Sequence, residues 1–332
     1  MHSAIQINTK LKFQYFLLFA FIFYCKNIYA SGNAVEDSVL WRLSRGHEVI
    51  NILGVTHVGF EKQYPVDKAI VNALNASGAM MIESNVIIES NQQVKERLLK
   101  AYRAESQNTT LEELLKSSYC DKISKEQKTL GNISSFLGPD LLPGLLKSSP
   151  RALIHQLYSH QSPLTEFEVK ELKVAEPLEL NLVKYAIQSN KKIMSLDPEF
   201  WDSIDALNEI EKCDLLVGMA YVYSSDKYKK RTAYEVLGKL KSLWFEGNSS
   251  EMRRQEFLWL NENTTLFSNN LSNWFSIRNR LMVDKIIKAS SFKQSELFVI
   301  LGAAHLSGND GVIARLKRMG FDSQPIHVGV SE

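Results

Sequence analysis

The same short pattern stands near both ends of the chain: an apolar run, a glycine and, three residues after it, a histidine. Residues 51–60 read NILGVTHVGF and residues 299–308 read VILGAAHLSG, so Gly54 precedes His57 and Gly302 precedes His305. Each apolar run is typical of a buried strand, and each is followed by a loop, a helical pattern, a glycine and another apolar run. The chain therefore has to accommodate two strand-GxxH-loop-helix-strand units.

Units of this kind usually form parallel strand pairs, with both histidines at the carboxyl ends of strands, where open α/β sheets bind ligands. A hairpin is predicted over 39–55, a helix opened by Pro65, a strand over 79–83, and a helix-to-strand step over 177–196. The second unit predicts a helix over 312–319 and a final strand over 325–330. We expect an α/β (or α+β) fold with a central mixed β-sheet. Residues 31–332 would form a single domain, with mainly helical insertions on the sheet faces at about 92–170 and 200–275.

The composition is that of a globular protein, with 45% hydrophobic and 23% charged residues in 332. Thirty-nine basic residues against thirty-seven acidic ones give a formal net charge of +2, which offers no electrostatic basis for binding nucleic acid. We therefore expect no nucleic-acid partner.

The first thirty residues read as a secretory signal peptide. Lys10 and Lys12 precede the apolar run FQYFLLFAFIFY, and Ala30 supplies a small residue for cleavage. The run is about a dozen residues, shorter than the roughly twenty that span a bilayer. An uncleaved anchor is the alternative and would be the only membrane contact; a lipid on Cys25 is a minor one. A periplasmic or extracellular protein is expected, in which Cys120 and Cys213 either form a disulfide or remain buried thiols.

A single histidine after a strand is most often a structural hydrogen-bonding group. Two such histidines, each preceded by a glycine that lets backbone approach closely, favour a shared site. Glu83 ends a buried strand, where a carboxylate needs an ion pair, hydrogen bonds or a metal; a structural salt bridge is the alternative. Two imidazoles and a carboxylate suit a divalent ion of the Mn, Co or Zn class.

Arg278 and Asn279 lie in WFSIRNRLMVDKI, which has the apolar spacing of a helix. Arg278 could orient a substrate carbonyl or carboxylate, or belong to a solvated or ion-paired helix face. The remaining histidines are interpreted as structural or surface residues: His47, His155, His160 and His327.

These motifs together resemble the TraB/GumN family, which also includes the Tiki membrane-associated metalloproteases. The resemblance rests on LWRLSRGHEVINILGVTHVG, MMIES, RNRLM and FVILGAAHLSGNDGVIARLKRMGF, in that order over nearly the whole mature chain. Because the chain has a predicted export leader, it most resembles the bacterial GumN-like branch of the family. The resemblance implies a pocket that unites His57, His305 and Glu83, and the Tiki branch implies peptide hydrolysis. One departure is MSLDPEFW, where Asp197 replaces the glutamate common in relatives and shortens the reach of that carboxylate.

The resulting hypothesis is an exported metal-dependent hydrolase, specifically a peptidase, acting on a peptide or another small hydrolysable substrate. His57 and His305 would bind a divalent ion that activates water, with Glu83 as a ligand or general base and Arg278 at the developing oxyanion or a substrate carboxylate. The alternative is a non-catalytic periplasmic binding or accessory protein, for example in polysaccharide export, that uses the same pocket. Metal-free esterase chemistry is less favoured because the chain has no GxSxG nucleophile elbow.

Overall fold

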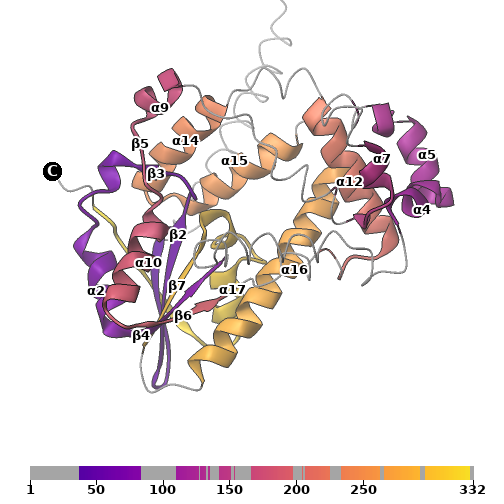
Figure 1. Ribbon diagram of the computed structural model, residues 1–332. Helices are drawn as coiled ribbons and strands as arrows, with labels where there is room; N and C mark the ends of the chain where they lie inside the picture. Colours follow the sequence, from indigo (N-terminus) through magenta and orange to yellow (C-terminus); the bar gives the residue numbers. More distant parts are fainter. Residues whose placement is uncertain are drawn as a thin grey trace, which may run out of the picture. The chain divides into compact units, whose positions relative to one another are not determined.

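The two apolar runs that precede the histidines become neighbouring parallel strands at the centre of one mixed sheet (Figure 1). The computed structural model describes residues 37–83, 110–126, 128–131, 134, 142–150, 153, 166–196, 204, 206–224, 233–261, 265–291 and 296–329. Within the chain, Ser38–Glu332 forms one compact unit. The predicted signal peptide and Cys25, and also Asp197, His155 and His160, lie outside the described residues.

The main sheet has six strands in the order β6-β4-β7-β2-β1-β8. Their bounds are β1 (Leu40–Arg45), β2 (Glu48–Val55), β4 (Ser77–Ile82), β6 (Lys192–Ser195), β7 (Glu296–Gly302) and β8 (Asp322–Ile326). Strands β6, β4, β7 and β2 run parallel, whereas β1 pairs antiparallel with both β2 and β8. Two further short strands, β3 (Gly59–Phe60) and β5 (Val174–Ala175), pair with each other.

The expected hairpin over 39–55 is the β1–β2 pair. The two strands of each GxxH unit run in the same direction, but they are not hydrogen-bonded neighbours as a simple parallel pair would be. Strand β7 lies between β2 and β4, and β2 and β1 lie between β7 and β8. The units therefore interleave, and this brings the two histidine-bearing strands side by side.

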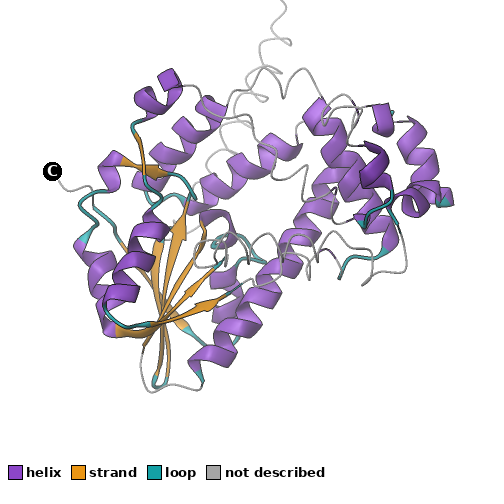
Figure 2. Cartoon of the chain, in the orientation of Figure 1, coloured by secondary structure: helices purple, strands orange, loops and turns teal. Residues whose placement is uncertain are grey.

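Helices occupy most of the remaining described chain (Figure 2). Their bounds are α2 (Lys68–Ala76), α4 (Leu111–Lys116), α5 (Ser118–Glu126), α7 (Leu142–Leu146), α9 (Glu166–Leu172), α10 (Leu178–Gln188), α12 (Glu209–Ser224), α14 (Ala233–Phe245), α15 (Ser249–Asn261), α16 (Thr265–Ser290) and α17 (Val312–Arg318), with short 3-10 turns η1 (Glu61–Gln63) and η4 (Ala303–His305). Most of the described residues within 92–170 and 200–275 are helical, with short turns between the helices, for example at 147–149 and 246–248.

Two predicted boundaries were wrong. The helix expected to open at Pro65 begins at Lys68, because the side chain of Asp67 accepts the backbone N–H of Ala69 and caps it. The final strand begins at Asp322 and ends at Ile326, earlier than the predicted 325–330, and Pro325 is tolerated because β8 is an edge strand.

Apolar side chains fill both faces of the sheet and make a three-layer core. Helices α2 and α10 cover one face, where Leu243 and Trp244 of α14 and Met252 of α15 join them. Helices α16 and α17 cover the other, as Figure 1 shows. A layer of helices on each face of a mostly parallel sheet is the usual way to bury strands that are apolar on both faces.

A disulfide joins two helices of the insertions, Cys120 in α5 and Cys213 in α12, with their Cα atoms 5.6 Å apart. Both cysteines are fully buried. Helix α5 packs on α4 and on α12, and α12 packs on α16. The described part of the chain contains no helix with the length and apolar character needed to cross a membrane.

Candidate functional site

Three parallel strands deliver the candidate residues to one edge of the sheet. Val55, the last residue of β2, aligns with Gly302, the last residue of β7, and Ile82, the last residue of β4, aligns with Ile300 of β7. His57 follows β2, Glu83 follows β4 directly, and His305 ends the turn η4 that follows β7. Residues far apart in the sequence therefore meet at the carboxyl ends of the parallel strands, where such folds bind ligands.

Close packing requires a glycine at position 54 and leaves little room for a side chain at Gly302. A Cβ atom on Gly54 would lie 2.6 Å from Cδ1 of Leu306 and 2.9 Å from Cα of Ala303. A Cβ on Gly302 would lie 3.1 Å from Nε2 of His57 and 3.3 Å from Oε2 of Glu83. The glycine at each position lets the two histidine turns approach each other and keeps space open between their side chains.

His57 has a left-handed backbone, with φ +57°, which is uncommon for a residue other than glycine. Its Nδ1 lies 3.0 Å from Oε1 of Glu179, and its Nε2 lies 3.5 Å from Oε2 of Glu83. About half of the side chain, 51%, is exposed, so this imidazole forms the open side of the site.

Glu83 lies at the centre of a polar cluster with His57, His305 and Arg278. Both of its carboxylate oxygens have partners. Oε1 accepts a hydrogen bond from Nη2 of Arg278 at 2.7 Å and lies 3.5 Å from Nε2 of His305. Oε2 accepts the backbone N–H of Gly302 and faces His57. Glu83 thus lies between the two histidines, and its side chain is only 11% exposed.

His305 is buried, with its side chain 4% exposed, and it stacks on Phe275 with ring centroids 4.7 Å apart. Its Nδ1 lies 2.6 Å from Oδ1 of Asn279. Both histidines therefore have Nδ1 against an oxygen atom and Nε2 directed at Glu83. This arrangement lets each Nδ1–H donate to its oxygen and directs each Nε2 at the carboxylate of Glu83.

Arg278 and Asn279 are both buried on α16. The guanidinium of Arg278 lies over the ring of Trp274, 5.3 Å from its centroid, and donates to Glu83. Arg278 was predicted either to orient a substrate group or to form an ion pair, and the described contacts favour the ion pair. Its proposed contact with substrate stays a prediction.

The charges of the cluster shift two pKa values strongly. Burial opposes the charged form of His57, but the hydrogen bonds and negative charges of Glu179 and Glu83 outweigh it and raise the pKa of His57 to about 10. Burial also favours neutral Glu83, but His305, His57 and Arg278 hold the pKa of that carboxyl well below its usual range. Solvent around the half-exposed His57 screens part of this interaction.

Glu179 was missed by sequence reasoning. It lies in the first turn of α10, next to Leu178, and is only 4% exposed. A signal was present, because Leu182 and Val183, three and four positions further along the helix, are apolar and mark the same face. A carboxylate on that buried face needs a partner, and only the fold shows that the partner is His57.

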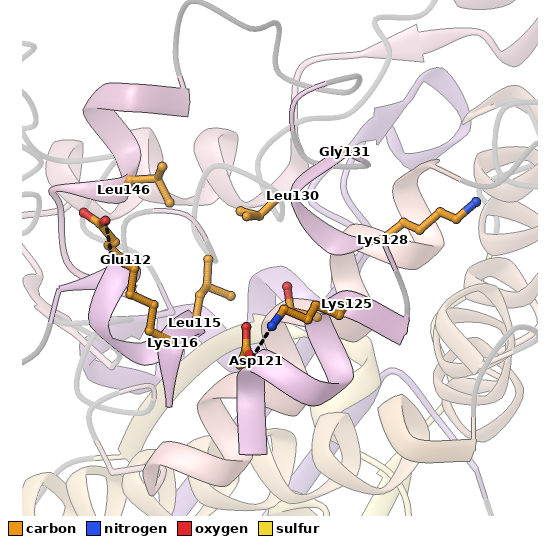
Figure 3. Close-up of a pocket in the computed structure, with 10 residues that line it drawn as sticks. Glu112, Leu115, Lys116, Asp121, Lys125, Lys128, Leu130, Gly131 and Leu146 are labelled. Atoms are coloured by element: carbon orange, nitrogen blue, oxygen red, sulfur yellow. Dashed lines mark hydrogen bonds and ion pairs between the residues drawn. The ribbon is translucent and has the colours of Figure 1, made fainter. Parts of the chain in front are cut away.

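The cluster contains side chains of the kinds that bind metal ions, but they are not arranged around a common point. Among the residues that the structure describes, no group of three or more His, Cys, Asp and Glu side chains is placed to hold a metal ion. A pocket of about 400 Å³ lies elsewhere, among the insertion helices. Its lining includes Leu115, Leu130, Leu146, Lys116 and Lys125 (Figure 3). None of its lining residues belongs to the histidine cluster.

Fold and site define an α/β protein with a polar His-Glu-His-Arg cluster at the carboxyl ends of three parallel strands. The family model of the TraB/PrgY/gumN family matches residues 39–325, and the chain belongs to this family. Neither the curated proteins nor the solved structures gave a match to the chain.

Proposed function

We propose that the protein is an exported metal-dependent hydrolase with peptides as its substrate class. The observation that carries the proposal is the opposed pair of imidazoles: Nε2 of His57 and Nε2 of His305 each lie 3.5 Å from a different oxygen of Glu83. Such a distance is close to the spacing between two ligands that share one ion at about 2.0–2.1 Å each. His57, His305 and Glu83 would hold the ion.

The surroundings of the two histidines suit a ligand role. Metal-binding histidines usually donate their second ring N–H to a carboxylate or carbonyl oxygen, as the contacts of His57 with Glu179 and His305 with Asn279 allow. The carboxylates that favour a proton on His57 would favour a divalent cation in its place, so binding would release protons. The side chains would have to close on a common point, since they do not surround one in the described structure.

A bound divalent ion would lower the pKa of a water toward about 7 and polarise a scissile carbonyl. Around it, Glu179 would orient His57 and Arg278 would hold Glu83 in its charged form. A carboxylate whose pKa is held so low is a weak base, which favours Glu83 as a ligand over Glu83 as the general base. The peptide substrate class rests on the resemblance to the Tiki branch, and export rests on the leader.

A second candidate is a binding or accessory protein that uses the same cluster without turnover. The buried Arg278–Glu83 ion pair favours it, because this pair neutralises the carboxylate with no metal present. Under this alternative the cluster would recognise a ligand through the half-exposed His57.

The test is elemental analysis of protein purified without chelators, followed by hydrolysis of a mixed peptide library with added Mn²⁺, Co²⁺ or Zn²⁺. We expect about one bound ion, and at least a 10- to 100-fold loss of metal affinity in His305→Gln and Glu83→Gln. The control is His47→Gln, at an exposed histidine in the β1–β2 turn. A wild type that takes up no metal, with variants that match it in every assay, contradicts the proposal. Metal or ligand binding without hydrolysis supports the second candidate.

A further inference from the structure

The pocket among the insertion helices has aliphatic walls. Leu115 of α4, Leu146 of α7 and Leu130, which follows α5 in the chain, lie around a common space in Figure 3. None of the described lining residues is aromatic. The volume of about 400 Å³ lies within the range of sites that bind small molecules, roughly 300–1,000 Å³. The walls therefore suit the flexible hydrocarbon part of a small ligand.

Helices α4 and α5 present matching charged residues to this pocket. Each helix has an acid followed four positions later by a lysine, and these positions lie on one helix face. Nζ of Lys116 donates to Oε1 of Glu112 at 2.6 Å, and Nζ of Lys125 donates to Oδ2 of Asp121 at 2.6 Å. The lysine side chains are 71% and 75% exposed. Two ammonium groups thus lie at the edge of an apolar space.

Ser124 is the polar residue of the wall itself. It lines the pocket from α5 and is only 7% exposed, and the described part of the chain offers its hydroxyl no hydrogen-bond partner. Most buried polar side chains have such a partner, and a hydroxyl left without one costs free energy. The corresponding position of α4 holds the apolar Leu115. Ser124 therefore supplies one donor beside an aliphatic wall, as a site for an amphiphilic ligand requires.

The charges of the lining favour a negative head group on that ligand. Three lysines, with Lys128 as the third, line the pocket against two acids. The ammonium group of Lys125 has three N–H donors and uses one of them on Asp121, so it can donate to a second acceptor. Exposed pairs of this kind are weak and are readily shared. The hydroxyl of the neighbouring Ser124 can donate to the same acceptor, and a carboxylate has two oxygens to receive both.

We propose that this pocket is a second binding site of the protein, which takes an aliphatic chain ending in one carboxylate, such as a medium-chain fatty acid. The chain packs on the leucines, and the carboxylate accepts hydrogen bonds from Ser124 and Lys125. The wall is already in place without the ligand, because the Cys120–Cys213 disulfide fixes α5 on α12. The proposal does not depend on hydrolysis or on metal binding at the histidine cluster.

The test is isothermal titration calorimetry of the full chain with hexanoate, octanoate and decanoate, each below the concentration at which it forms micelles. We expect one carboxylate per chain, with an affinity that rises about fourfold for each CH₂ group that enters the pocket. Octylammonium has the same chain as octanoate and a positive head. It should bind roughly 10-fold more weakly, because it would place a cation against the lysines.

Two variants on α5 test the head-group contacts. Ser124→Ala should weaken octanoate binding about 10-fold, because a hydrogen bond to a charged group is lost. Its matched control is Ser118→Ala, at an exposed serine of the same helix outside the pocket. Lys125→Gln should weaken octanoate binding roughly 2- to 5-fold, whereas Lys122→Gln, at an exposed lysine of α5 outside the pocket, should not.

A variant of the wall tests where the chain lies. Leu130→Glu should abolish octanoate binding, because it puts a negative charge into the aliphatic wall; Leu130 is 41% exposed, so the fold tolerates the change. Three results would each overturn the proposal: no saturable binding of the fatty acids, equal affinity for octanoate and octylammonium, or octanoate binding in Ser124→Ala and Leu130→Glu that equals that of the wild type. The last result would place the ligand elsewhere on the chain.

Discussion

At the scale of single residues, His57 combines an unfavourable backbone with a strongly paired side chain. A left-handed conformation costs a residue with a Cβ atom about 1–2 kcal/mol, and such strain is concentrated at functional sites. The contacts of the imidazole with Glu179 and Glu83 offset that cost. The turn is therefore maintained by the same carboxylates that create the negative environment of the cluster.

The raised pKa of His57 predicts how its contribution to stability changes with pH. The pKa rises from 6.5 to about 10 on folding, so this contribution is fully present below pH 6.5 and is lost as the pH rises toward 10. In the presence of EDTA, we expect the wild type to have a higher urea midpoint than His57→Asn. The difference should be largest near pH 6 and should shrink progressively as the pH is raised to 10. Asparagine tolerates the left-handed backbone, so the variant keeps the turn. A midpoint difference that stays constant between pH 6 and pH 10 would falsify this assignment.

At the scale of helices and strands, the insertions serve two different purposes. Helices α14 and α15 contribute to the sheet core and contact both GxxH turns: Nε1 of Trp244 donates to the Gly54 oxygen at 2.8 Å, and Arg253 holds the loop after His305. Helices α4, α5 and α12 pack on one another and are crosslinked by the Cys120–Cys213 disulfide. The first pair supports the site, whereas the second group forms a crosslinked local unit that packs on α16 through α12.

Removal of the disulfide should destabilise that local unit more than the sheet. For the double variant Cys120→Ala/Cys213→Ala we expect a free energy of unfolding lower by about 2–5 kcal/mol, because the crosslink closes a long loop in the unfolded chain. Hydrogen exchange should accelerate in α5 and α12 while β2 and β7 keep their protection. Equal acceleration in the strands would mean that the crosslinked helices and the sheet unfold as one cooperative unit.

At the scale of the whole molecule, export to an oxidising compartment stays a prediction from the leader, and the Cys120–Cys213 disulfide suits such a compartment. Disulfides persist in exported proteins and are rare in the reducing cytosol. Because cleavage signals require small residues, we expect the exported protein to begin at Ser31, after Ala30. Amino-terminal sequencing of the exported protein checks this, with Ala30→Ser processed normally and Ala30→Lys blocked. An intact mass equal to that of the full 332-residue chain would instead indicate an uncleaved anchor.

The local pattern of the sequence was enough to predict the strands that carry the histidines, the helices that follow them and an α/β sheet. These features depend on the spacing of apolar residues over one element, so they can be read within a short window. The same pattern singled out His57, Glu83 and His305, since each lies shortly after the end of a buried strand.

Only the tertiary structure decided how these pieces combine. Strand β7 lies between β2 and β4, so the two units interleave, and this order depends on long-range pairing that no local spacing encodes. Glu179 and Arg253 are ordinary helix residues in the sequence, and Asn279 was a candidate site residue without an assigned partner. All three gain their contacts because folding buries them against His57, His305 and the loop after it. The physical reason is that a buried polar side chain needs hydrogen-bonding partners, and three-dimensional packing decides which partners it meets.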